Sequence, residues 1–341
     1  MRQPVKVTRS HPWLRAVPPP GGAFDGEVPA GQAIRILTGA VVPPGVDTVV
    51  LEEDVSTDGQ RIAFAGPLKK GANTRKAGED VEAGELAVPA GTRLGPAELA
   101  LLAATGVTHV TVFQRLRIGV LSTGNELAAP EETTDPTRTY DANRPMLLSL
   151  IEDWSMNAID LGHVRDDRAA LKEKLNYATA RCDVILTSGG ASGGDEDHVS
   201  ALLGETGSRA DWRIALKPGR PLALGMWKGV PVFGLPGNPV AALVCTLIFA
   251  RPAFGVLGGE GWTVPQGFMV PAGFEKNKKP GRREYLRARM TPEGTVEVFK
   301  SEGSGRISGL AWADGLVELP DEAVHVTPGT PVKYLPYASF R

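Results

Sequence analysis

The segment DVILTSGGASGGDED (183–197) decides the fold, because it joins a strand to a glycine-rich loop and the loop to a helix. Its first part, DVILTS (183–188), is a short apolar run that predicts a strand. The glycines Gly189, Gly190, Gly193 and Gly194 follow at once. Glycines allow the backbone to approach a ligand closely. A short helix is expected over 197–204, so the segment predicts one strand–loop–helix unit.

Three acids, Asp195, Glu196 and Asp197, stand directly after these glycines. Backbone N–H groups of a glycine-rich loop favour a phosphate, whereas adjacent carboxylates repel it. A magnesium ion resolves this conflict, because Mg²⁺ prefers one or two carboxylates plus substrate phosphates. The alternative is a solvated acidic turn in which Asp195 or Asp197 caps the next helix. The loop is not a Walker loop, since no GK[ST] follows.

The same alternation extends on both sides of this unit. Strands are expected at 117–122, 157–162, 212–216, 221–225 and 231–236, and helices at 143–154, 168–180 and 239–250. Alternating strands and helices predict a parallel α/β sheet with right-handed crossovers. Short β runs between Gly and Pro turns occupy 31–95 and the region after about 260, where no helix is expected. A helix is expected at 94–106, and a loop or frayed start over 1–30.

The fold class is therefore multi-domain α/β plus β, in which a central parallel α/β domain is flanked by a β-rich N-terminal module and a small C-terminal β-barrel. The expected boundaries are a remnant linker or dimerisation domain at 1–30 and 92–113, a β-rich domain at 31–91, the α/β domain at 114–258 and the barrel at 259–341.

Composition narrows the class of function. The chain has 341 residues and a net charge of -2, which argues against nucleic-acid binding. Two distant cysteines, Cys182 and Cys245, indicate neither a zinc site nor a disulfide framework and fit a reducing cytoplasm. The apolar stretch 239–250 is too short to span a bilayer and is expected to end at Arg251-Pro252.

Three loops should meet at one rim, because ligands bind beyond the carboxyl ends of the strands of such a sheet. They are STGNEL (122–127) with Glu126, the glycine-rich loop, and LPGNP (235–239), where Asn238 and Pro239 begin a helix. Glu126 could share the metal or simply be solvated. A helix start favours an anion, although it also explains a plain N-cap. Asp166 and Asp167 either join the rim or cap helix 168–180.

Basic residues are expected near this acidic rim. Lys217 and Arg220 lie in KPGRP (217–221), and Arg213 and Arg287 add charge that could compensate a polyanionic substrate. An isolated basic turn is otherwise a surface feature. Arg213 and Lys217 are four residues apart, and on the strand expected at 212–216 this spacing puts them on one face.

Many motifs occur in a recognisable order. They are IRILTGAVVPPGVDTVV (34–50), RKAGEDVEAGE (75–85), STGNEL, YDANRP (140–145), VRDD, the glycine-rich loop, LKPGRP, GLPGNPVAAL and SEGSGRISGLAWADGL (301–316). In this the chain resembles the molybdopterin molybdenumtransferase family, which includes MoeA and the gephyrin E domain. The resemblance covers about residues 30–341.

The resemblance implies a cytoplasmic homodimer of four-part subunits with a shared active site and a MogA-like α/β domain. The implied reaction is insertion of molybdate into adenylylated molybdopterin with release of AMP, and Mg²⁺ is required. Contact with the molybdopterin adenylyltransferase is a further implied partnership, whereas no nucleic-acid or membrane partner is expected.

Site residues follow by motif position. The resemblance implies catalytic roles for Thr38, Asp80, Glu126, Asp166, Asp197 and Lys217, with Asp197 and Glu126 holding the metal and Thr38 and Asp80 coming from the second subunit. Expected substrate-binding residues are Ser188, Gly189, Gly190, Gly193, Arg213, Pro218, Gly219, Arg220, Gly237, Asn238, Arg287 and Ser304. Arg213 stands where the family has a lysine, and its planar fork differs from an ammonium group.

One departure concerns the front of the chain. Family members carry a DGYA motif with an active-site Asp before the GQAIRI block, and no DGYA precedes GQAIRI (31–36) here. The sequence therefore leaves two alternatives to the transferase: a catalytically impaired binding or scaffold protein, and a molybdopterin adenylyltransferase that consumes ATP.

Overall fold

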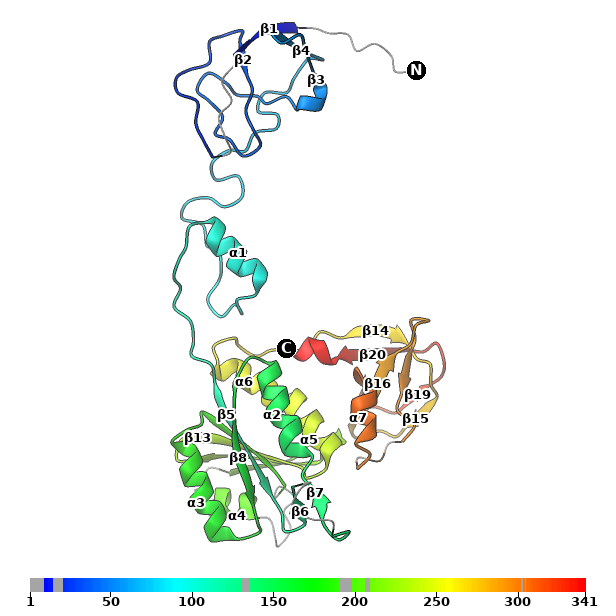
Figure 1. Cartoon of the computed structure of the whole chain (residues 1–341). Coiled ribbons are helices and arrows are strands. Elements are labelled where there is room, and N and C mark those ends of the chain that lie inside the picture. The colour runs from blue at the N-terminus through cyan, green and yellow to red at the C-terminus, as the bar shows by residue number, and fades with distance from the viewer. Residues whose placement is uncertain are drawn as a thin grey trace. The chain divides into compact units, whose positions relative to one another are not determined.

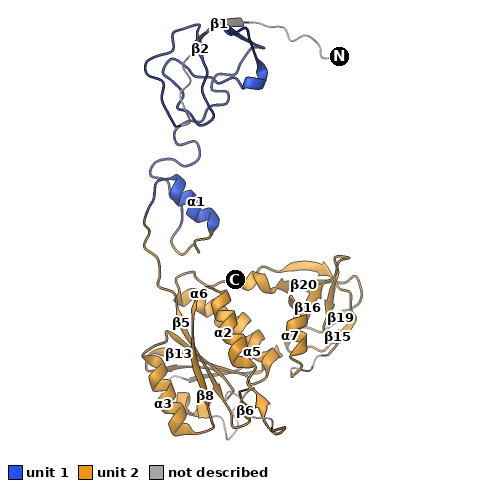
Figure 2. Ribbon diagram, in the orientation of Figure 1, with its two compact units in different colours: residues 1–89, 96–108 blue, residues 90–95, 109–341 orange. Residues whose placement is uncertain are grey.

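The computed structural model describes residues 9–14, 21–129, 135–189, 198–205, 209–301, 303 and 305–341. The chain forms two compact units (Figure 2), unit 1 from 1–89 and 96–108 and unit 2 from 90–95 and 109–341. Four residues of the predicted site, Gly190, Gly193, Asp197 and Ser304, fall outside the described residues.

Unit 1 is a small sheet with one helix (Figure 1). Its strands, in the spatial order β2-β1-β4-β3, are β1 (Arg9–Leu14), β2 (Ala33–Ile34), β3 (Val55–Thr57) and β4 (Arg61–Phe64). A 3₁₀ turn, η1 (Glu52–Asp54), precedes β3. The expected loop at 1–30 is wrong for 9–14, because β1 gains its ladder from β4, some fifty residues later. Helix α1 (Pro96–Ala104) lies where it was predicted.

A six-stranded sheet forms the centre of unit 2, in the order β10-β12-β13-β9-β5-β8. Its four parallel strands are β13 (Val230–Leu235), β9 (Val184–Ser188), β5 (Arg117–Thr123) and β8 (Asn157–Val164). All of β5 after Arg117 is buried, as expected for a strand covered on both faces.

The other edge of this sheet is antiparallel. β12 (Pro221–Trp227) pairs antiparallel with both β13 and β10 (Arg209–Arg213). The sequence prediction of a parallel sheet therefore holds for β13, β9, β5 and β8 but not at this edge. The physical reason is the connection: only the turn at Lys228 and Gly229 joins β12 to β13, and a parallel crossover needs a dozen or more residues.

Helices cover both faces of the sheet. α2 (Asn143–Asp153) and the long helix after β13 pack on one face, where Ile118 and Val120 point. α3 (Arg168–Thr179) and α4 (His198–Glu205) pack on the other, against Leu121 and Ile185. Two short strands, β6 (Leu127–Ala128) and β7 (Thr139–Tyr140), lie outside the main sheet.

The long helix consists of α5 (Pro239–Cys245), a π-helical stretch (Thr246–Ala250) and α6 (Arg251–Leu257). The predicted end at Arg251-Pro252 is wrong, because the π-helical stretch accommodates the proline, which has no N–H to donate. At 19 residues the helix is long and apolar enough to cross a membrane by length and composition, but 72% of the apolar window is buried within the protein. It is a core helix here, since Leu243, Leu247 and Phe254 belong to the main hydrophobic core.

A second sheet, ordered β11-β16-β18-β20-β14, completes unit 2. Its strands are β11 (Leu216–Lys217), β14 (Phe268–Pro271), β16 (Arg283–Met290), β18 (Gly315–Leu319) and β20 (Pro331–Pro336), with β17 (Val296–Val298) paired to β16. β15 (Lys276–Lys278) pairs with β19 (Val324–Val326). The expectation of no helix after 260 misses the short α7 (Ser308–Trp312) and a final 3₁₀ turn (Tyr337–Phe340).

Candidate active site

Asn143 links three segments at the carboxyl ends of the parallel strands. From the start of α2, its Nδ2 donates to Ser188 Oγ at the end of β9 and to the carbonyl of Gly237 before α5, both at 2.7 Å. The N–H of Gly189 donates to the carbonyl of Leu235 at 3.2 Å. The predicted meeting of the loops after β9 and β13 is therefore present in the described residues.

Buried polar atoms without partners surround this junction. Ser122 Oγ, Thr123 Oγ1, Thr187 Oγ1 and Asn143 Oδ1 have no hydrogen-bond partner within the described part of the chain. Ser122 and Ser188 lie side by side in the β5–β9 register. A buried polar atom without a partner is costly and calls for an explanation. Four such atoms at adjoining strand ends indicate a polar site for a ligand.

Gly189 starts the glycine-rich loop in a backbone conformation that favours glycine, with φ +95°. A Cβ at this position would lie 2.5 Å from the carbonyl oxygen of Thr123. A Cβ on Gly237 would lie 3.8 Å from the Cα of Gly189. The ends of β9 and β5 therefore approach each other more closely at Gly189 than a side chain permits. This close approach is the physical reason for glycine at 189.

The loop after β5 is joined to the loop after β8. The N–H of Asn125 donates to Asp166 Oδ2 at 2.9 Å, and the N–H of Asp166 donates to Asn125 Oδ1 at 3.2 Å. Asp167, not Asp166, caps α3, accepting from the N–H of Ala170 at 2.8 Å. Asp167 therefore has the capping role, and Asp166 contacts Asn125, the residue before Glu126.

Glu126 itself is exposed, and its carboxylate lies against Gly124, where a Cβ would overlap it. His163 of β8 holds the same loop, because its Nε2 lies 2.6 Å from the carbonyl oxygen of Gly124. This contact requires Nε2 to carry the hydrogen, since a carbonyl only accepts. Glu126, Asp166 and His163 therefore form one corner of the strand-end region.

Asn238 is the N-cap of α5. Its side-chain oxygen accepts from the N–H groups of Val240 at 3.2 Å and Ala241 at 3.4 Å. Its amide nitrogen is 3.9 Å from the position that a Cβ of Gly305 would occupy. The start of α5 therefore lies beside the turn that carries the predicted Ser304, and the capping role of Asn238 leaves its amide facing that turn.

The KPGRP turn packs against α5. A Cβ at Gly219 (φ +114°) would lie 2.6 Å from Cys245 Sγ, and that thiol is buried. Lys217 makes an ion pair with Glu284 of β16, at 3.3 Å. Pro218 is half-buried and Arg220 is exposed. The backbone of Arg213 ends β10, while its side chain lies outside the described part of the structure.

Arg287 is buried and holds the turn 301–306. Its Nη1 donates to the carbonyl of Arg306, and its Nη2 to the carbonyls of Ser301 and, at 3.1 Å, Gly303. The guanidinium lies 4.8 Å from the ring centroid of Phe299. Burial lowers its pKa below the ordinary arginine value. In this geometry Arg287 orders the turn around residue 304, so a direct contact with substrate stays a prediction.

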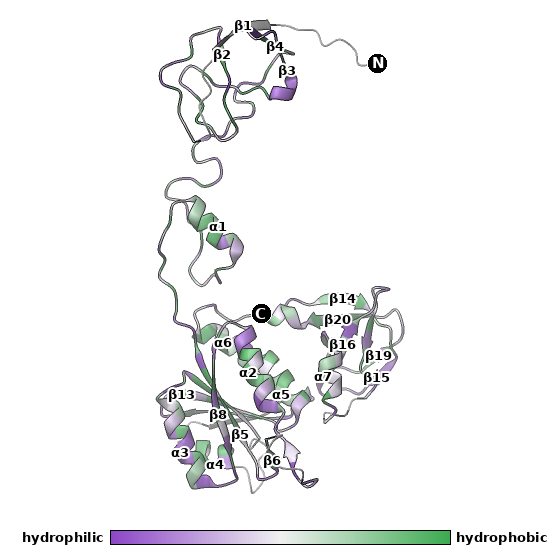
Figure 3. Ribbon diagram, in the orientation of Figure 1, coloured by the Kyte–Doolittle hydropathy of each residue, from purple (hydrophilic) through white to green (hydrophobic). Residues whose placement is uncertain are grey.

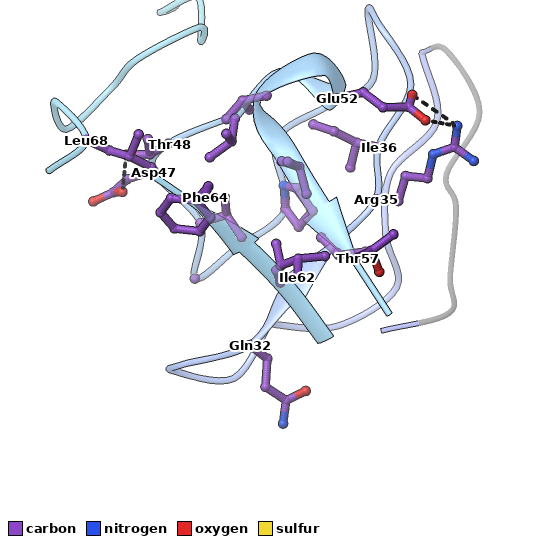
Figure 4. A pocket seen from close by; sticks show the side chains of 18 of the residues that line it. Gln32, Arg35, Ile36, Asp47, Thr48, Glu52, Thr57, Ile62, Phe64 and Leu68 are labelled. Atoms are coloured by element: carbon purple, nitrogen blue, oxygen red, sulfur yellow. Dashed lines mark hydrogen bonds and ion pairs between the residues drawn. The ribbon is translucent and has the colours of Figure 1, made fainter. Parts of the chain in front are cut away.

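Thr38 and Asp80 are exposed on unit 1. Unit 1 also contains a cavity of about 970 Å³ (Figure 4), whose wall includes Ile36, Ile62 and Phe64. Neither predicted residue lines it. An ion pair of Arg35 with Glu52 (3.2 Å) lies on its wall. Because neither Thr38 nor Asp80 lines this cavity and Arg35 on its wall is already paired with Glu52, the strand ends of unit 2 remain the candidate site.

Among the described residues, no group of three or more His, Cys, Asp and Glu side chains could hold a metal ion. The predicted ligand Asp197 is not among them. Sequence reasoning also missed two residues. Asn143 looked like part of an apolar helix, although the sharp turn YDANRP (140–145) could have drawn attention to it. Glu284 had no sequence signal, because its partners lie far away in the chain.

Comparisons with known proteins agree along the whole chain. Family models match the MoeA N-terminal region (domain I and II) at 5–106, a probable molybdopterin binding domain at 119–255 and the MoeA C-terminal region (domain IV) at 270–337. A molybdopterin molybdenumtransferase of Haemophilus influenzae is 34% identical over 323 residues, 93% of this chain and 80% of that protein. One of Nostoc sp. is 34% identical, covering 89% of this chain and 72% of that protein.

A solved structure supports the same fold. The molybdopterin biosynthesis moeA protein from Pyrococcus horikoshii OT3 superposes with a TM-score of 0.81 at 27% identity. The match covers 96% of this chain and 81% of that one. The predicted multi-domain α/β plus β class is therefore confirmed.

Proposed function

Because the chain belongs to the molybdopterin molybdenumtransferase (MoeA) family, we propose that it inserts molybdate into adenylylated molybdopterin and releases AMP. It acts as a transferase in molybdenum cofactor biosynthesis. The observation that supports this assignment is a group of four buried polar atoms at the ends of β5 and β9 and the start of α2 that have no partner in the described part of the chain. They suit a polar, phosphate-bearing substrate at a strand-end site.

The phosphates of the substrate bind where backbone N–H groups are exposed. The glycine-rich loop that begins at Gly189, with Gly190 and Gly193, contributes donors together with Ser188. The segment Gly237-Asn238 adds the positive end of the helix dipole of α5. Asn143 holds these segments in place through Ser188 and Gly237. The substrate then satisfies the buried hydroxyls that have no partner among the described residues.

The donor set fits Mg²⁺ as a metal held mainly by the substrate. Mg²⁺ usually takes one or two carboxylates plus phosphates and water, so the lack of a three-residue cluster in the described residues is no obstacle. Glu126, exposed on its loop, and Asp197 are the residues that would hold the ion. When bound, it would neutralise phosphate charge. Asp166 fixes the backbone of the loop through Asn125.

Molybdate binds near the basic residues of the site. Lys217 supplies positive charge on the KPGRP turn, with Pro218, Gly219, Arg220 and Arg213 around it. Arg287 acts by holding the turn that contains Ser304, because its guanidinium donates to the carbonyls of that turn. The dithiolene sulfurs replace oxygen ligands of molybdate, which leave as water. Water attacks the phosphoanhydride bond, so that AMP leaves and the molybdopterin keeps its own phosphate.

The protein works as a homodimer in which Thr38 and Asp80 complete the site of the second subunit. Among the unit 1 residues whose side chains are described, only Val28, Pro43 and Ile62 are apolar and buried. Helix α1 buries no residue although it is mostly apolar (Figure 3). A unit with so small a core is poorly stabilised alone, and a second copy would cover this apolar surface.

The expected location is the cytoplasm, where two buried thiols would stay reduced. There the protein would receive its substrate from the molybdopterin adenylyltransferase by direct contact.

The proposed function is tested by detecting the molybdenum cofactor that the reaction should form. Purified chain is incubated with adenylylated molybdopterin, molybdate and Mg²⁺, and the mixture is added to an apo-molybdoenzyme whose activity is measured. We expect activation without ATP. Activation that requires ATP and non-adenylylated molybdopterin would instead indicate an adenylyltransferase. Substrate binding without activation would indicate the binding or scaffold alternative.

The metal assignment predicts that Glu126→Gln raises the Mg²⁺ concentration for half-maximal AMP release by about tenfold, the loss of one carboxylate ligand being on the order of 1–2 kcal/mol. Asp167→Asn is the matched control, because Asp167 only caps α3. A normal Mg²⁺ requirement in the Glu126 variant would remove this residue from the metal site.

A further inference from the structure

The buried hydroxyl groups at the strand ends lie on two faces of the central sheet. Paired residues of β5 and β9 point to the same face, and the faces alternate along each strand. Leu121 pairs with Thr187, and Ser122 pairs with Ser188. Leu121 belongs to the core under α3 and α4, whereas Val120, two residues before Ser122, belongs to the core under α2 and α5. Thr187 therefore lies on the α3–α4 side, and Ser122 and Ser188 lie on the α2–α5 side.

Two buried hydroxyl oxygens lie on the α3–α4 side, because Thr123 follows Leu121 by two residues and shares the face of Thr187. Their Oγ1 atoms have no hydrogen-bond partner among the residues that the structure describes. Thr123 also adjoins the glycine-rich loop, since a Cβ at Gly189 would be 3.0 Å from its Oγ1. A hydroxyl group can donate its hydrogen. Both threonines therefore suit an ionised phosphate, which only accepts.

On the α2–α5 side one buried atom is of a different kind. The Gly237 carbonyl only accepts, so the Asn143 side-chain atom that lies 2.7 Å from it must be the nitrogen. The other hydrogen of this nitrogen goes to Ser188 Oγ, also at 2.7 Å. The remaining atom, Asn143 Oδ1, is a buried acceptor with no partner within the described ranges. Ionised phosphate and molybdate cannot pair with it, since both only accept.

Neighbouring contacts fix the direction of this acceptor. Arg144, the next residue, pairs with Asp141 at 3.1 Å and with Asp160 of β8 at 2.8 Å. These ion pairs tie the start of α2 to the sheet. Rotation of the Asn143 amide would break two buried hydrogen bonds, and buried groups are costly to leave unpaired. A ligand that meets Asn143 Oδ1 therefore has to present a donor.

The wall beside this acceptor suits a planar ring. Gly237 and Gly189 lie next to each other, since a Cβ on Gly237 would be 3.8 Å from the Cα of Gly189. Neither residue has a side chain, so the backbone presents a flat surface here. Adenine and pterin, the two heterocycles of adenylylated molybdopterin, are planar, and each carries an exocyclic amino group. An amino group donates hydrogen and so matches Asn143 Oδ1.

We propose that Asn143 is a specificity-determining residue whose Oδ1 binds the exocyclic amino group of a heterocycle of the substrate. Thr123 and Thr187, with Ser188 between the two sides, bind the adjoining phosphate. The inference rests on the proposed function, because adenylylated molybdopterin is taken as the ligand. The two sides of the sheet end therefore recognise chemically different parts of one substrate.

The test replaces the amino group of the ligand by a carbonyl oxygen. AMP is compared with inosine monophosphate (IMP), and 6-hydroxymethylpterin with 6-hydroxymethyllumazine, by calorimetric titration of the full chain. The wild type should bind the amino ligand of one pair about thirtyfold more tightly than its carbonyl counterpart, because the carbonyl leaves Asn143 Oδ1 without a donor. The pair that shows this preference identifies the ring. Equal binding within both pairs would overturn the proposal.

Asn143→Ala should abolish the preference and leave the two ligands of that pair within about threefold of each other. Ser188→Ala is the matched control, since it removes one partner of the same amide while Gly237 still holds the nitrogen. The control should preserve the preference. A preference that persists in Asn143→Ala, or that disappears equally in Ser188→Ala, would contradict a specific role for Asn143 Oδ1.

A ribose hydroxyl is the competing donor. If it met Asn143 Oδ1, AMP and IMP would bind equally to the wild type, and Asn143→Ala would weaken both by the same factor. Pterin and lumazine ligands would then bind equally as well, because they lack ribose. This combination of results would overturn the assignment to an amino group.

Thr187→Val tests the phosphate side. Valine has nearly the same shape but no hydroxyl group, so no buried polar atom is left without a partner and the fold should be at least as stable. The variant should weaken AMP and IMP by the same factor, about fivefold, the size of one lost hydrogen bond. Adenosine, which has no phosphate, should keep its affinity. A change in the ratio of AMP to IMP affinity would contradict the division between the two sides.

AMP release from adenylylated molybdopterin separates the two proposals. Protein that shows the preference dependent on Asn143 but releases no AMP with molybdate and Mg²⁺ would refute the proposed function and leave the amino-group assignment standing. Protein that releases AMP but prefers the amino ligand in neither pair would refute the amino-group assignment alone.

Discussion

Asn143 illustrates how one side chain organises the strand ends. Its amide donates both hydrogens, to Ser188 and to the Gly237 carbonyl, while its own oxygen has no partner among the described residues. The side chain is only 6% exposed. A buried amide with its donors used and its acceptor vacant suits a site where the ligand supplies a donor.

Asn143→Ala should lower the free energy of unfolding by about 2 kcal/mol, because Ser188 Oγ and the Gly237 carbonyl lose a buried donor. It should also raise the KM for adenylylated molybdopterin. Asn176→Ala is the control, since Asn176 on α3 accepts from Trp227 Nε1 at 3.1 Å away from the strand ends. Both variants lose stability in urea titrations, but only Asn143→Ala should change KM. An unchanged KM would restrict Asn143 to a structural role.

The two cysteines should be inert in the native protein. Burial raises the pKa of the Cys245 thiol to about 12 and that of Cys182 to about 11, from an ordinary value of 9.0. Thiolates are the reactive form, so a thiol reagent at pH 8 should label neither residue until denaturant is added. Rapid labelling of native protein would contradict the burial described.

These raised pKa values also set a direction for stability. The native state holds the thiol protons more tightly than the unfolded chain, so the contribution to stability is complete below pH 9 and is lost as pH rises from 9 toward 12. Buried Tyr285 and Tyr337 act in the same direction, because burial raises their pKa values. The urea concentration at which half of the protein is unfolded should therefore decrease when the pH is raised from 8 to 10.5.

At the scale of elements, the loop after β9 depends on a close approach of backbones. Gly189 and Gly162 both have positive φ, +95° and +76°. A Cβ at Gly189 would meet the Thr123 carbonyl at 2.5 Å, whereas nothing lies within 4 Å of one at Gly162. An alanine at Gly162 would therefore suffer only backbone strain, whereas an alanine at Gly189 would suffer both strain and steric overlap.

Gly162→Ala should cost about 1 kcal/mol, the strain of an alanine at positive φ. Gly189→Ala should cost about 2 kcal/mol more, because the overlap pushes β5 and β9 apart, and it should abolish AMP release. Thermal unfolding and activity are compared for the two variants. Equal stability losses would show that the strand ends are not packed as described.

The limits of sequence prediction are visible in particular elements. β5, β8, β9, α2 and α3 were predicted within a few residues, because their apolar patterns are local. The antiparallel edge, the strand β1 and the pairing of β11 with β16 were not predicted, since each depends on a distant partner. The junction of the three loops followed from strand order, whereas the partners of Lys217 and Arg287 could not.

At the scale of the whole molecule, the main hydrophobic cluster of unit 2 includes residues of both of its sheets. The main hydrophobic cluster includes Phe233 and Phe254 beside Tyr285, Leu335 and Phe340 of the second sheet and its final turn. Arg251 of α6, 2% exposed, donates to the Phe340 carbonyl at 2.9 Å and pairs with Glu260 at 2.9 Å. The end of the chain is therefore tied to the α/β core.

This continuity predicts that unit 2 unfolds in one transition. Fluorescence of single-tryptophan variants retaining Trp154 or Trp312 should give the same urea midpoint. Arg251→Met should lower both midpoints together, by about 3 kcal/mol in free energy, because it breaks a buried ion pair. Separate midpoints for the two probes would show that the sheets fold independently.

The central claim is transfer chemistry at the strand ends, and AMP release tests it most directly. AMP is measured from adenylylated molybdopterin with molybdate and Mg²⁺ together, and with each omitted in turn. We predict release of one AMP for each molybdenum inserted, only when both are present. Intact adenylylated molybdopterin bound without any AMP release in the complete mixture would contradict the account.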